Sequence, residues 1–128
     1  MFYNCTSLAS FNSDLSSLDD GTGMFYNCSR LMSFTSDLSS LTNGIEMFGT
    51  CINLTIFNSD LSSLTDGDNM FRNCSRLMSF TSDLSSLTNG SGMFYGCNNL
   101  QRFDASLASI TEATDFTEIF DTAIGQTL

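Results

Sequence analysis

The sequence predicts a right-handed solenoid, a fold in which short repeats stack as successive coils. The stretch 24–44 recurs at 70–90 with a single change, Tyr26 against Arg72. This echo is two turns of a 23-residue period, because a Met-Phe pair opens the chain and returns every 23 residues. Seven apolar positions recur in the copies, and one copy cannot bury them without a neighbour. The right hand follows from the chirality of parallel crossover connections.

The repeat register sets the expected domain organisation. Five coils follow one another without insertion, at 1–23, 24–46, 47–69, 70–92 and 93–115. A glycine preceded by Asn or Asp lies near the end of the first four copies, and it would break a continuous amphipathic helix. Disordered tracts contain few aromatic residues, whereas this chain has 12 phenylalanines in a strict frame.

Two columns of phenylalanine and one of cysteine form the expected core ladder. Coils paired through parallel strands would lie roughly 4.8 Å apart. Each fully buried large side chain then contributes roughly 1.5–3 kcal/mol to folding. The columns are Phe2, Phe25, Phe48, Phe71 and Phe94; Phe11, Phe34, Phe57, Phe80 and Phe103; and Cys5, Cys28, Cys51, Cys74 and Cys97.

The cysteine column is expected to hold buried, reduced thiols. Its spacing equals the repeat period and lacks the close pairs of a zinc site. In-register side chains on neighbouring coils point in parallel, which keeps their Cβ atoms too far apart for a disulfide. We therefore expect the thiols to act as small apolar fillers.

The segment MFYNCTSLASF at 1–11 resembles the F-x-x-C-x-x-L core of BspA-type leucine-rich repeats. Bacterial surface repeats in which M-F-x-x-C-x-x-L recurs are similar over all five copies. The chain departs from the best-known form downstream, where Ser-Asp-Leu-Ser-Ser-Leu replaces a proline and an I-G-x-x-A-F segment. The resemblance implies a leucine-rich-repeat solenoid of parallel β-strands with short helical or 3-10 turns. In it, Phe-x-x-Cys would be a helical turn and 8–13 would contain a strand.

The same resemblance implies a location but no single activity. Proteins with such repeats include surface adhesins, secreted interaction proteins and phage tail-fibre components. An extracellular, cell-surface or virion location is therefore expected. The repeat itself does not fix which of these roles applies, because one fold hosts many functions.

Enzyme chemistry is not expected. The chain has no histidine, so it has no Ser-His or Cys-His pair. No glycine-rich phosphate loop is present. The carboxylate pairs Asp19/Asp20 and Asp66/Asp68 adjoin turn glycines, where aspartate is a common turn former. We expect no catalytic residue and no cofactor.

The recurring column of aspartates has two interpretations, turn capping and calcium binding. Each member follows a serine and precedes Leu-Ser-Ser-Leu, which favours capping of the following turn. A row of carboxylates about 5 Å apart would also repel, and calcium ions could compensate that charge. The weak calcium candidates are Asp14, Asp37, Asp60 and Asp83.

A row of hydroxyl groups recurs as Ser-x-Thr around a buried aliphatic residue. Ser40-Leu41-Thr42 is one example, and in an extended segment its serine and threonine would face out together. The simplest interpretation is a solvated face. Binding of a glycan, packing against another rod and ordering of ice remain alternatives.

Two positions vary within the fixed frame and indicate a binding surface. Tyrosine and arginine are favoured in interfaces; both occur at the third repeat position, and arginine occurs at the seventh. The partner-binding candidates are Tyr3, Tyr26, Arg30, Arg72, Arg76 and Tyr95.

Charge and hydropathy exclude some partners. The net charge of −10 opposes nucleic acid, whose binding depends on cationic contacts with phosphates. It also opposes an anionic membrane surface, and no apolar run reaches the ~20 residues of a membrane span. We expect a protein or glycan ligand at the surface.

The two ends of the chain differ in pattern. Spacings of three and four over 111–125 predict an amphipathic helix, so 111–128 is expected to cap the last coil. Met1 lies inside a repeat, so either preceding residues or another chain should cover the first coil. End-to-end self-association into a filament or fibre is therefore the alternative to an adhesion or interaction scaffold.

Overall fold

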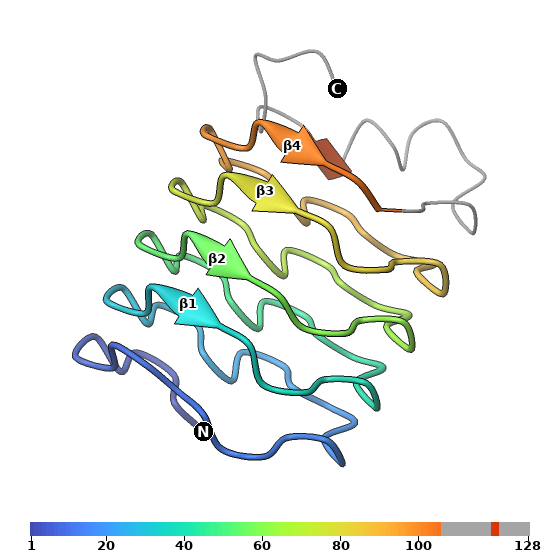
Figure 1. Cartoon of the computed structure of the whole chain (residues 1–128), viewed down its shortest axis with the longest axis horizontal. Helices are drawn as coiled ribbons and strands as arrows, with labels where there is room; N and C mark the ends of the chain where they lie inside the picture. Colours follow the sequence, from blue (N-terminus) through green and yellow to red (C-terminus); the bar gives the residue numbers. More distant parts are fainter. Residues whose placement is uncertain (106–118, 121–128) are drawn as a thin grey trace.

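The chain forms a stack of irregular coils with short parallel strands along one side (Figure 1). The computed structural model describes residues 1–105 and 119–120. The strands are β1 (Ser33–Phe34), β2 (Ile56–Phe57), β3 (Ser79–Phe80) and β4 (Arg102–Phe103). β1 pairs in parallel with β2, and β3 pairs in parallel with β4. The predicted parallel pairing of successive coils is confirmed.

Each strand falls inside the segment where the family resemblance placed it, but it is only two residues long. The carbonyl oxygen of Met32 accepts both backbone N–H groups of Thr55 and Ile56, so two residues of one coil face one residue of the other. Such a bulge ends regular pairing. The first copy has no strand in the structure.

A second line of parallel bridges joins the first four copies near the other end of the repeat. It joins Asp20 to Asn43, Asn43 to Asp66 and Asp66 to Asn89. Beyond it, alternate amides donate to the next coil, as when Gly23 and Phe25 bind the carbonyls of Ile45 and Met47. The expected Phe-x-x-Cys helical turn is a turn closed by i→i+3 hydrogen bonds, of the kind seen in 3-10 helices.

Two continuous ladders of phenylalanine rings run through the core. Phe25 stacks on Phe48 at 5.5 Å, and Phe34 stacks on Phe57 at 6.0 Å. The two ladders meet edge to face, as at Phe34 and Phe48, whose ring centroids lie 4.7 Å apart. Each interior ring therefore has both stacked and T-shaped neighbours, the arrangements that aromatic pairs prefer.

Ile119 and Phe120 extend the Met and Phe columns beyond the fifth copy. The amide of Phe94 donates to the carbonyl of Ile119 at 3.0 Å, and the ring of Phe120 stacks on Phe94 at 5.7 Å. Ile119 is fully buried. These two residues were expected to belong to the stripe of a capping helix, and the remainder of that predicted helix lies outside the described residues. Handedness and coil boundaries stay predictions.

Two repeat positions adopt positive φ in the part of the chain that the structure describes. At the fourth position the residues are Asn4, Asn27, Thr50 and Asn73, with φ of 56–61°, and Gly96 with φ of 76°. At the last position of the first four copies they are Gly23, Glu46, Asn69 and Gly92. Asparagine and glycine are the residues that adopt this conformation at lowest cost.

Candidate functional site

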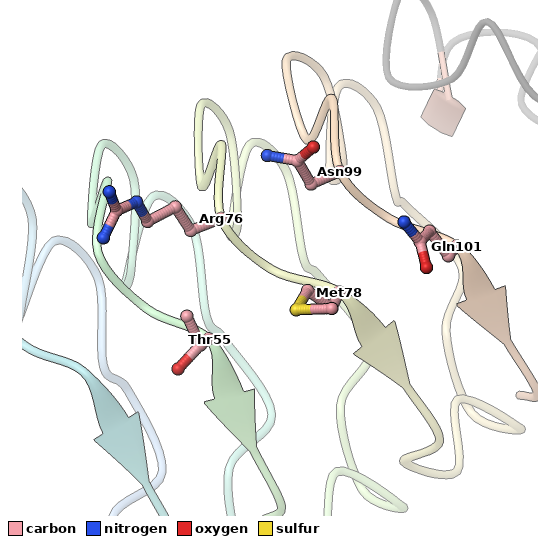
Figure 2. A pocket seen from close by; sticks show the side chains of 5 residues that line it. All are labelled: Thr55, Arg76, Met78, Asn99 and Gln101. Carbon is pink, nitrogen blue, oxygen red and sulfur yellow. The ribbon is translucent and has the colours of Figure 1, made fainter.

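A shallow groove of about 250 Å³ lies beside the strands and crosses three coils (Figure 2). Thr55, Met78 and Gln101 stand where β2, β3 and β4 begin. Arg76 and Asn99 reach it from the preceding turns, and the Arg76 guanidinium extends toward the coil that carries β2. The groove thus combines positions seven and nine of successive repeats.

Three of the groove side chains recur 46 residues earlier in the chain, where a fourth position has threonine in place of glutamine. There Arg30, Met32, Asn53 and Thr55 take the repeat positions that Arg76, Met78, Asn99 and Gln101 occupy in the groove. We call these residues together the Arg–Met strip: Arg30, Met32, Asn53, Thr55, Arg76, Met78, Asn99 and Gln101. Thr55 belongs to both halves, so the strip is continuous across four coils.

Asparagine and arginine alternate at the seventh position, and they behave differently. Asn53 donates from Nδ2 to the carbonyl oxygen of Ser29 in the preceding coil, at 2.7 Å. Arg30 and Arg76 have no hydrogen bond or ion pair with any residue that the structure describes. Their cationic groups are therefore available to a ligand.

Large apolar side chains are exposed in and beside the strip. Met32 is 59% exposed, Ile56 57% and Met78 51%, although each is next in sequence to a buried residue. Met32 and Met78 belong to the Arg–Met strip, and Ile56 directly follows its Thr55. Sequence reasoning did not single them out, although Met32 and Met78 are apolar residues outside the seven core columns.

The tyrosine-containing column on the turn side is largely engaged with itself. The rings of Tyr3 and Tyr26 stack at 4.9 Å, and the Arg72 guanidinium lies 4.3 Å from the centre of the Tyr95 ring. A Cβ at Gly49 would come within 2.8 Å of the Tyr26 ring, so glycine makes room for it. The six predicted contact residues thus divide between this column and the Arg–Met strip.

Acidic side chains gather near Arg72. The pKa of Asp68 is raised, first by burial and then by the carboxylates of Asp66 and Glu46, while Arg72 opposes that rise. Among the residues that the structure describes, no group of three or more potential ligands is placed to hold a metal ion.

The aspartate column caps the turn that follows it. In each aspartate, Oδ1 accepts a hydrogen bond at 2.8 Å from the backbone N–H of the residue two positions later. For example, the N–H of Ser62 donates to Asp60. Hydrogen bonds from Ser62 lower the pKa of Asp60, and those from Ser16 lower the pKa of Asp14. This is the capping interpretation of the pattern, and it uses one oxygen of each carboxylate.

The threonines of the hydroxyl row bind backbone groups of the preceding coil. The hydroxyls of Thr65 and Thr88 each donate at 3.0 Å to the carbonyl oxygen of the residue 23 positions earlier. Thr42 donates to the Asp19 side chain. Their donors are therefore used within the fold, which counts against a regular outward array of free hydroxyl donors.

The cysteines are free thiols, and each from Cys28 to Cys97 donates a hydrogen bond. The Sγ atom of Cys51 lies 3.2 Å from the carbonyl oxygen of Phe25, and the other three repeat this contact at 3.1–3.2 Å. Burial raises the pKa of Cys51 and of Cys97 to about 12. The thiols thus fill space and also satisfy backbone carbonyls between the coils.

The family model of the BspA-type leucine-rich repeat region matches residues 1–119, in six copies. The chain belongs to the BspA-type leucine-rich-repeat family. The predicted resemblance is therefore confirmed, with one copy more than the five that the strict 23-residue register predicts.

Other comparisons with this BspA-type chain are weaker. A crystal structure of a leucine rich cell surface protein from Faecalibacterium prausnitzii A2-165 is 18% identical to it, with a TM-score of 0.48. That match covers 88% of this chain and 35% of the other, so the chain spans about a third of that protein. No curated protein matches the chain. Within the described residues, no helix has the length and apolar character needed to cross a membrane.

Proposed function

We propose that this BspA-type chain is a non-enzymatic interaction module, exposed on a cell surface or a virion, whose ligand contacts the Arg–Met strip. One observation carries the proposal. Two arginines without partners among the described residues each lie two residues before a methionine that is more than half exposed. Exposed apolar groups rimmed by polar ones are typical of interaction sites.

Family membership supports the proposed location. Proteins with these repeats include surface adhesins, secreted interaction proteins and fibre components, and the acidic charge of −10 suits solubility outside the cell. Buried thiols fit such a location, because burial and raised pKa values protect them from oxidation.

The test is retention of the labelled chain on immobilised extracellular matrix proteins and surface polysaccharides. The proposal predicts saturable binding to at least one polymer, reversed by an excess of the same polymer in solution. Uniform absence of binding across such a panel, with the chain folded by circular dichroism, would overturn it.

A second candidate is a structural role in a self-assembling filament or fibre. Its support is the first coil, where Phe2, Leu8 and Phe11 are only partly buried, whereas their equivalents in the second, third and fourth copies are buried. Coils stacked end to end would cover these side chains. Negative-stain electron microscopy at increasing protein concentration distinguishes the two, since filaments that lengthen with concentration favour assembly and discrete particles oppose it.

A further inference from the structure

We infer that the Arg–Met strip binds an acidic, extended peptide that runs along the axis of the coil stack, with carboxylates at every third residue. This inference rests on the proposed function, because it names the partner of the same surface. The partner is a polypeptide segment in the polyproline II conformation. Its carboxylates would pair with Arg30 and Arg76, and its apolar residues would cover Met32 and Met78.

The charge of the strip supports an anionic ligand. The chain carries 14 acidic residues and 4 arginines. Nevertheless the segments 30–33, 53–56, 76–79 and 99–102, which hold the strip and the first residue of each strand, contain no acidic residue. They contain three of the four arginines, and only Arg102 among these has an ion pair, at 3.7 Å from Asp104. The strip is thus a local cationic surface on an acidic protein, which favours an anionic ligand.

The spacing of the two arginines supports a ligand in the polyproline II conformation. Arg30 and Arg76 occupy the same repeat position two coils apart. Because parallel-paired coils lie about 4.8 Å from one another, the backbones of these two arginines are separated by about 10 Å. Polyproline II advances about 3.1 Å per residue with three residues per turn, so every third side chain lies on one face, about 9.3 Å apart. A β-strand places alternate residues on one face, about 6.6 or 13 Å apart, and does not match.

The asparagines that alternate with the two arginines along the strip support a ligand with a free backbone. Asn53 and Asn99 use Nδ2 to bind the carbonyls of Ser29 and Ser75, both at 2.7 Å. This leaves the amide oxygens as acceptors for backbone N–H groups of a ligand. Polyproline II has no internal hydrogen bonds, so its backbone groups remain free to meet such acceptors.

The exposed methionines account for specificity toward a peptide. Met32 and Met78 are more than half exposed and each follows its arginine by two residues. Methionine adapts its shape to varied apolar partners. An apolar side chain beside each carboxylate would cover a methionine while the carboxylate meets the arginine.

The test is fluorescence anisotropy with a labelled peptide of three Glu-Pro-Leu triplets. The inference predicts saturable binding, weakened about tenfold by R30Q and by R76Q, the size expected for losing one charge-assisted contact. The matched control is R72Q, which changes the net charge equally but lies in the turn-side column, and it should change the Kd by less than about twofold. A Gln-Pro-Leu peptide should bind weakly, and so should a peptide of the same composition with its three glutamates adjacent.

Three results would overturn the inference. They are equal binding of the adjacent-glutamate peptide, equal weakening by R72Q, and preferential binding of a uronic-acid oligosaccharide of the same charge. If the panel of extracellular polymers retains the chain while the triplet peptide does not bind, the inference fails and the proposed function stands. If neither binds, both fail.

Discussion

The side-chain amide of Asn99 donates to the carbonyl oxygen of Ser75 in the preceding coil, at 2.7 Å. Asn53 makes the equivalent bond to Ser29. At the same repeat position, Arg30 and Arg76 make no such bond within the described residues. The alternation therefore assigns two roles to one position: asparagine ties neighbouring coils together, and arginine projects from them.

This division predicts different costs for truncating the two residue types. Asn53→Ala should lower the free energy of unfolding by about 1 kcal/mol, because it removes one internal hydrogen bond and leaves the Ser29 carbonyl unpaired. Arg76→Ala should change it by less than about 0.5 kcal/mol, as for an exposed residue without partners. Urea denaturation measures both, and equal losses would contradict the assignment.

The positive-φ positions predict a stabilising substitution. Thr50 is β-branched and has a φ of 56°, whereas the equivalent residues 4, 27 and 73 are asparagine. Thr50→Asn should raise the free energy of unfolding by about 1 kcal/mol, since it relieves backbone strain. The reciprocal change Asn27→Thr should lower it, partly because the Asn27 amide also donates to Asn4 at 3.0 Å. Chemical denaturation of the pair checks the sign, and a stabilised N27T would refute the argument.

The ring ladders predict a gradient of core sensitivity. Phe71 contacts two stacked and two edge-on rings and is fully buried. Phe71→Ala should cost about 3–5 kcal/mol, as expected for a buried aromatic residue. Phe2→Ala should cost clearly less because Phe2 is only partly buried. Thermal denaturation of both variants tests this, and comparable losses would mean that the first coil is covered in solution.

The buried thiols predict a loss of stability at alkaline pH. Burial raises the pKa of Cys51 and Cys97 from 9.0 to about 12. Above pH 9 the unfolded state therefore releases thiol protons that the folded state retains, so stability falls as pH rises from 9 toward 12. Below pH 9 these two groups add no pH dependence. The Cys51→Ala variant should show a shallower decline of melting temperature over that window, and an unchanged slope would contradict the linkage.

The regular part of this fold could be predicted because its determinants are periodic. Phe48, Cys51 and Leu54 recur at fixed intervals, and burial in a stack follows from that frame. Side-chain contacts between copies are harder to predict from the sequence. The Asn99–Ser75 bond depends on side-chain reach across 24 residues, and a single copy contains nothing that indicates it. Thr88 is exposed, as expected for the hydroxyl row, but the hydrogen bond that its hydroxyl donates to the preceding coil was not predicted.

The last copy shows where a strict period misleads. Ile119 lies 26 residues after Met93, so a strict 23-residue register does not align the two residues. Nevertheless the carbonyl oxygen of Ile119 accepts a hydrogen bond from the Phe94 amide, as the carbonyl oxygen of Met93 accepts one from the Phe71 amide. The Ile-Phe pair at 119–120 was the available sequence signal, because it replaces Met-Phe with residues of similar size. Exposed Met78 was missed because it lies outside the seven recurring apolar columns from which the core was predicted.

The most direct test of the account is to place the same negative charge on two faces of the coil stack. Met78→Glu puts it in the Arg–Met strip, and Ser40→Glu puts it at an exposed turn residue outside the strip. Binding of both variants to the polymer that retains the unaltered chain is then measured by biolayer interferometry. The account predicts that M78E loses at least about tenfold in affinity while S40E stays within about twofold. Intact binding by M78E, or equal loss in S40E, would contradict the assignment of the ligand face.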